Sequence, residues 1–101
     1  MFKAVSGIDW DTGNRAKCQK HGVTIGQIAA LFHGSVMVFP DRQHSLKETR
    51  YLGIGSTNDG RFILVAFTFR LRDGQQLIRP ISARFMHAKE IKHYEAQRKD
   101  S

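Results

Sequence analysis

The chain has 101 residues, of which 41% are hydrophobic and 25% are charged, which is enough for one modest core and excludes a large multidomain protein. Lysine and arginine number 16 against 9 acidic residues, and the net charge of +7 favours a polyanionic partner: nucleic acid, an anionic membrane or an acidic protein. The single cysteine, Cys18, excludes an internal disulfide, and no apolar run is long enough to cross a membrane. We expect one soluble, cytoplasmic domain over residues 1–101.

The first third of the chain predicts two short helices. Asp11 is a good N-cap for a helix of roughly ten residues, and Gly22 stands where a left-handed glycine would end it. Thr24 with Gln27 three residues later forms a capping box for a second helix, which Gly34 ends. The two helices should therefore follow each other across a tight hinge.

The rest of the chain predicts a sheet and a final helix. Residues 1–7 are expected to form a lead-in strand or arm, and four strands are expected over residues 36–39, 50–55, 61–70 and 76–83. The strand at 61–70 is apolar on both faces, which is typical of a central position. Pro80 lacks an amide hydrogen and predicts an edge or a bulge in the last strand. With a helix from about His87, the fold class is α+β: two N-terminal helices and a C-terminal helix packed on one face of a four-stranded, twisted antiparallel sheet.

Arginines gather at the predicted strand ends. A guanidinium group binds phosphate well, because it offers a rigid bidentate fork and stays charged. The alternative is that each one is an ordinary solvated surface charge. The six residues are Arg50, Arg61, Arg70, Arg72, Arg79 and Arg84.

Lys20 and His21 occupy the last turn of the first predicted helix. The partial negative charge at a helix C-terminus stabilises cations, so both residues are expected there as capping groups. Alternatively, the sharp turn at Gly22 presents both side chains to a ligand.

The polar loop at 41–48 offers an acid–base pair, His44 with Glu48, or simply a hydrogen-bonded loop cluster. The histidines are scattered and no metal-ligand spacing is present, so neither a metal nor another cofactor is expected. Cys18 lies mid-helix and is expected to be a small core residue. Gly53 and Gly55 are expected to make room for a helix above their strand.

A series of short motifs along the chain resembles the BrnT family of ribonuclease toxins. The resemblance runs from about residue 8 to residue 95. The motifs are residues 8–11 (Ile-Asp-Trp-Asp), residues 20–23 (Lys-His-Gly-Val), Phe32, Asp41 with His44 and Ser45, Glu48, Arg50, Gly60-Arg61, residues 78–84 (Ile-Arg-Pro-Ile-Ser-Ala-Arg), Glu90 and Tyr94.

This resemblance implies a fold related to the RelE toxins and a toxin of a bacterial type II toxin–antitoxin system. The implied activity is metal-independent endoribonuclease cleavage that blocks translation. The implied partners are RNA and a BrnA-like antitoxin that binds DNA. The toxin is expected to form a hetero-oligomer with this antitoxin and to contact DNA only through it. No membrane partner is expected. The site residues implied are Lys20, His21, Glu48, Arg50, Arg70, Arg79 and Arg84.

RNA carries its own nucleophile, the 2′-hydroxyl, so the enzyme needs only a base, an acid and cations. We expect Glu48 or His21 to transfer protons and Lys20 to neutralise phosphate charge. The arginines at 70, 79 and 84 would stabilise the transition state. The alternatives are a non-catalytic basic module that binds nucleic acid or an acidic protein, and a regulator that binds operator DNA, although no recognition helix is evident.

Three positions depart from the family pattern. Asn14 stands where the family usually has lysine, Cys18 where it has asparagine, and Pro80 where it has an aliphatic residue. Pro80 would shift the strand register and re-aim Arg79 relative to Arg84, which have opposite parity on a regular strand.

Overall fold

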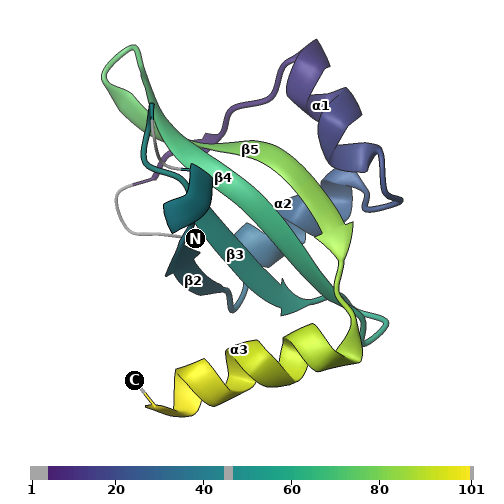
Figure 1. Cartoon of the computed structure of the whole chain (residues 1–101). Helices are drawn as coiled ribbons and strands as arrows, with labels where there is room; N and C mark the ends of the chain where they lie inside the picture. Colours follow the sequence, from purple (N-terminus) through teal and green to yellow (C-terminus); the bar gives the residue numbers. More distant parts are fainter. Residues whose placement is uncertain (1–4, 45–46, 101) are drawn as a thin grey trace.

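The computed structural model describes residues 5–44 and 47–100, and within them the chain forms three α-helices and a five-stranded mixed sheet (Figure 1). The sheet order is β1-β5-β4-β3-β2, in which β1 runs parallel to β5 and the other neighbours are antiparallel. Figure 1 shows α2 crossing behind the sheet, α1 beside β5 and α3 across one end of the strands. The elements are β1 (Gly7–Ile8), α1 (Thr12–Gln19), α2 (Ile25–His33), β2 (Met37–Pro40), a 3-10 turn (Arg42–His44), β3 (Tyr51–Ser56), β4 (Phe62–Arg72), β5 (Gln75–Phe85) and α3 (Ala88–Asp100).

Both N-terminal helices begin where the sequence predicts. The Asp11 side chain accepts the Asn14 amide at 2.9 Å, and the Asn14 side chain accepts the Asp11 amide at 2.8 Å. The same reciprocal pair joins Thr24 and Gln27, at 3.0 and 2.9 Å. Gly22 adopts a φ of 90°, a left-handed conformation that favours glycine. Local hydrogen bonding therefore sets the boundary between α1 and α2, as predicted.

The prediction of a four-stranded, purely antiparallel sheet was wrong in detail. The lead-in strand or arm expected over residues 1–7 forms a fifth strand at its end, β1, with Gly7 opposite Leu77 and Ile8 opposite Ile78 in parallel register; residues 1–4 of that expectation lie outside the described residues. Two residues are too few for an alternating pattern, and β1 exists only because β5 offers it an edge. The prediction that 61–70 is central was confirmed, since β4 lies third of five.

The predicted irregularity at Pro80 is a bulge, at a point of β5 that strand β1 does not reach. Ala66 pairs with Ser82, but the next residue, Phe67, pairs with Pro80, which leaves Ile81 as an extra residue on β5. A proline fits here because a bulge already interrupts the ladder of hydrogen bonds.

The bulge is held from α1. The buried Asn14 side-chain amide donates to the Pro80 carbonyl at 3.0 Å and to the Asp9 carbonyl at 2.9 Å. Two of the departures from the family pattern therefore touch each other: Asn14 satisfies a backbone acceptor on the irregular stretch that contains Pro80.

One face of the sheet, which we call the α2 face, carries the main core. The Phe32 ring of α2 meets the Phe67 ring of β4 edge-on, with ring centroids 5.0 Å apart. Gly53 and Gly55 lie on this face, and a Cβ at Gly55 would overlap Leu31 and come within 3.0 Å of a backbone oxygen. The prediction that these glycines make room for a helix was thus confirmed. The buried cluster comprises Cys18, Val23, Ile28, Leu31, Phe32, Ile63, Val65, Phe67, Ile78 and Ala83.

The opposite face, which we call the α3 face, is covered in part by the last helix. The ring centroids of Phe39 in β2 and Tyr94 in α3 lie 5.0 Å apart. Phe39 pairs with Leu52, which pairs with Ala66, and cross-strand partners share a face, so α3 lies opposite α2. The prediction that all helices pack on one face was therefore wrong. In the described part of the chain, no helix is both long and apolar enough to span a bilayer.

Candidate functional site

A cleft of about 440 Å³ opens on the α3 face between α1, the sheet and α3. Its floor is formed by small and apolar side chains of β3 and β4, and its rim is polar. Three of the lining side chains are cationic and one is acidic, which favours an anionic ligand. The cations are Lys17, Arg50 and Arg84; Asp41, Gln43, Ser82 and Tyr94 are the other polar groups.

Arg84 is held by α3. Its Nη1 and Nη2 donate to Oε1 and Oε2 of Glu90 at 2.8 and 2.7 Å, a bidentate ion pair. Glu90 Oε1 also accepts the His87 amide at 3.1 Å at the start of the helix. The hydrogen bonds that Glu90 accepts, first from Arg84 and then from the His87 amide, lower the pKa of Glu90 to about 2. The hydrogen bonds that Arg84 donates to Glu90 raise the pKa of Arg84. Both groups are therefore charged at neutral pH.

Arg79 lies on the same face as Arg84, although the two have opposite parity along the strand. Arg79 pairs with Thr68 and Arg84 with Leu64, and these β4 partners are four residues apart. The bulge at Ile81 thus turns Arg79 onto the α3 face. The predicted re-aiming of Arg79 relative to Arg84 was confirmed.

The Arg79 guanidinium, however, is bound by two carboxylates. Its Nη1 lies 3.1 Å from Asp9 Oδ2 and its Nη2 lies 2.5 Å from Asp11 Oδ2, while Arg72 Nε shares Asp9 at 3.0 Å. Two hydrogen bonds lower the pKa of Asp11: the larger effect comes from the Asn14 backbone amide and the smaller from the Arg79 guanidinium. Arg79 therefore joins β5 to the segment before α1, and it does not line the cleft.

Glu48 and Arg70 form a further pair on this side of the molecule. The distance between Arg70 Nη2 and Glu48 Oε2 is 3.6 Å, with side-chain exposures of 40% and 37%. Neither residue lines the cleft. The expected pairing of Glu48 with His44 cannot be followed, because the His44 side chain and Ser45 lie outside the described residues.

Lys20 and His21 are exposed at the C-terminal end of α1, where the sequence predicts capping groups. Neither lines the cleft. Lys17, one helical turn earlier than both, does. Lys17 was not predicted from the sequence, although its i,i+3 and i,i+4 spacing from Lys20 and His21 was a signal for it. The position of Tyr94 was not predicted either, since nothing local shows which face α3 covers.

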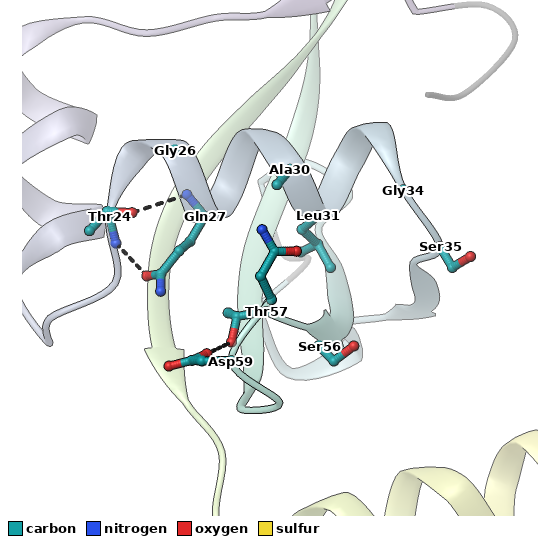
Figure 2. A pocket seen from close by; sticks show the side chains of 11 residues that line it. Thr24, Gly26, Gln27, Ala30, Leu31, Gly34, Ser35, Ser56, Thr57 and Asp59 are labelled. Carbon is teal, nitrogen blue, oxygen red and sulfur yellow. Dashed lines mark hydrogen bonds between the residues drawn. The ribbon is translucent and has the colours of Figure 1, made fainter.

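A second hollow, of about 530 Å³, lies on the other side, between α2 and the β3–β4 turn (Figure 2). Figure 2 shows Thr24 and Gln27 hydrogen-bonded to each other on one wall, and Thr57 hydrogen-bonded to Asp59 on the other. Its lining has one carboxylate and no cation. This hollow is larger than the cleft but unsuited to a polyanion.

Cys18 is fully buried in the core, and burial raises the pKa of its thiol to about 11. It is therefore a neutral packing residue at physiological pH, as predicted. Among the described residues, no three side chains of the metal-binding types converge.

A family model described as the ribonuclease toxin BrnT of type II toxin–antitoxin systems matches residues 10–90. That range includes all seven residues proposed from the sequence and every residue of the cleft named above except Tyr94. No curated protein matches the chain.

Proposed function

Because this chain belongs to the BrnT family of ribonuclease toxins of type II toxin–antitoxin systems, we propose that it is a metal-independent endoribonuclease whose substrate site is the α3-face cleft. The observation that carries this assignment is the convergence on one cleft of Lys17 from α1, Arg50 from the residue before β3, and Arg84 from β5. An RNA backbone carries one negative charge per nucleotide, and guanidinium groups bind its phosphates in bidentate fashion.

The proposed reaction is an in-line transesterification. The 2′-oxygen attacks the adjacent phosphorus, the 2′-hydroxyl proton passes to a base, and the bond to the 5′-oxygen breaks as that oxygen takes up a proton. The products are a 2′,3′-cyclic phosphate and a 5′-hydroxyl. Arg84 and Arg50 stabilise the negative charge that develops on the phosphorane, and Lys17 lies close enough to add to the same field.

Proton transfer is assigned to Glu48 or His21. Glu48 is half-exposed, and an ionised carboxylate held at 3.6 Å from Arg70 is able to accept the 2′ proton. His21 is exposed one turn beyond Lys17 and would reach an RNA strand that extends out of the cleft along α1. Lys20 would bind phosphate of the same strand. In this mechanism Arg70 holds Glu48 in position, and Arg79 holds the segment before α1 in position.

The test is cleavage of a labelled RNA by the purified protein in excess chelator. We expect cleavage to persist and to leave 2′,3′-cyclic ends. Arg84→Gln should lower the rate by about 10²-fold, as loss of one transition-state donor does in other enzymes. Arg15→Gln is the matched control, since Arg15 is an exposed arginine of α1 stacked near Trp10 and loses the same charge. Abolition by chelator would refute metal independence, and equal rates for the two variants would exclude the cleft.

A second candidate function is RNA binding without catalysis. The observation in its favour is that the described lining of the cleft contains no histidine. Two variants, His21→Ala and Glu48→Ala, distinguish the nuclease from the binding module. A nuclease loses cleavage and cellular toxicity in at least one of them, whereas a binding module keeps its toxicity in both and loses it only when cleft arginines are replaced.

Membership of a type II toxin–antitoxin family implies an RNA target and a protein antitoxin. We propose that the antitoxin is BrnA-like and that its acidic side chains are attracted by the net charge of +7. Comparing the RNase activity of the free toxin with that of the co-purified complex tests this. Equal activity would contradict it.

A further inference from the structure

Helix α3 is attached to the rest of the molecule by few contacts. The Arg84–Glu90 pair and the ring contact between Phe39 and Tyr94 join it to the sheet. Along residues 88–97 every side chain is exposed or only half-buried. By contrast, α2 contributes three fully buried side chains to the core. Among the described residues, the position of α3 therefore depends on an ion pair and a ring contact and not on fully buried apolar side chains.

The carboxylate of Glu90 binds the Arg84 guanidinium group with the same bidentate geometry that a phosphodiester would use. Each of its two oxygens accepts one guanidinium nitrogen, at 2.8 and 2.7 Å, and a phosphodiester presents two non-bridging oxygens to the same fork. Arg84 also faces the cleft that contains Lys17 and Arg50. The chain thus places one of its own anions on a cation of the cleft.

We propose that Arg84 is the subsite for one backbone phosphate of the RNA, and that Glu90 is an internal competitor that has to release Arg84 before RNA binds there. This inference rests on the proposed function in that it takes RNA as the ligand of the cleft. Tyr94 lies on the same helix as Glu90 and lines the same cleft.

The test measures binding of a 2′-O-methyl oligoribonucleotide, which has no free 2′-hydroxyl and is not cleaved, by fluorescence anisotropy. Glu90→Gln removes the charge but keeps an oxygen that accepts the His87 amide, so the start of α3 is retained. We expect the Kd to fall about fivefold, the range that a partly exposed ion pair supports. Glu95→Gln, at an exposed position of the same helix, changes net charge equally and should alter the Kd by less than about twofold.

A double-mutant cycle separates competition from a structural effect. In an Arg84→Gln background, Glu90→Gln should no longer improve binding, because the contact it relieves is already absent. In cleavage assays Glu90→Gln should lower KM and leave kcat within about twofold. Circular dichroism of each variant checks that α3 remains helical.

The outcomes distinguish the inference from the proposed function. Arg84-dependent cleavage combined with equal oligonucleotide affinity for Glu90→Gln and Glu95→Gln would overturn only the inference. Tighter binding by Glu90→Gln that depends on Arg84, in a protein that cleaves no RNA, would support the phosphate subsite and refute the nuclease.

Discussion

The two faces of the sheet are held by different kinds of interaction. The α2 face is closed by interlocking apolar side chains, with Phe32 and Phe67 at its centre and glycines that let the helix approach. The α3 face buries Ile54 and Leu64 but otherwise depends on the pair between Arg84 and Glu90 and on one ring contact. Apolar burial contributes far more stability than an exposed ion pair does. The α2 face therefore fixes the fold, and the contacts of the α3 face are weaker and more polar.

The largest effect is expected on the α2 face. Phe32→Ala should lower the free energy of unfolding by about 3–5 kcal/mol, because the fully buried ring leaves a cavity among closely packed neighbours. Urea denaturation measures the change. Val38→Ala, on an exposed position of β2, should cost less than about 1 kcal/mol. If both cost the same, the α2 face is not the main source of stability.

Overpacking of the same face comes next. Gly55→Ala should destabilise by about 1–3 kcal/mol, since the new methyl group overlaps Leu31 and meets a backbone oxygen that cannot easily move. Gly26→Ala, in an exposed turn of α2 where a Cβ would make only an ordinary contact with Thr24 Oγ1 at 3.8 Å, should stabilise by about 0.5–1 kcal/mol through helix propensity. Thermal unfolding measures the change in Tm of both variants. If the close approach of α2 is what requires glycine at position 55, the Tm falls in Gly55→Ala and rises in Gly26→Ala.

The α3 face should tolerate a comparable truncation. Tyr94→Ala removes a half-buried ring and its contact with Phe39, and we expect a loss of about 1 kcal/mol. Chemical denaturation gives this number. A cost as large as that of Phe32→Ala would mean that α3 is an integral part of the core, and the contrast between the faces would fail.

The smallest effect concerns acid. The pKa of Glu90 is lowered from 4.5 to about 2, so its ion pair contributes stability that is complete above about pH 4.5 and is lost as the pH falls through about 2. The Tm of wild type should exceed that of Glu90→Gln near pH 6, and the gap should close on acidification. Because the pair is partly exposed, the gap should correspond to less than about 1 kcal/mol. A gap that is constant from pH 6 to pH 2 would show that the charge of Glu90 does not contribute to stability.

Local sequence patterns were sufficient to predict most boundaries of the helices and strands, but they were insufficient to predict which residues line the cleft. Side chains three residues apart, such as Thr24 and Gln27, fix helix starts through their own hydrogen bonds, so sequence reveals them. The convergence of Arg50 and Arg84 with Lys17 depends instead on strand register and on where α1 crosses β5. Arg79 looked like an equal member of the arginine group, yet the carboxylates of Asp9 and Asp11 bind it.

The sequence by itself determined the α+β class, the four longer strands, the helix caps, the buried thiol and the family, because each depends on neighbours in the chain or on motif order. The tertiary structure alone decided the parallel pairing of β1 with β5 and the position of α3 on the face opposite α2. These features depend on contacts between residues far apart in sequence. The ion pair between Arg84 and Glu90 joins residues only six positions apart, but it too depends on the tertiary structure, because it forms only where the end of β5 leads into α3.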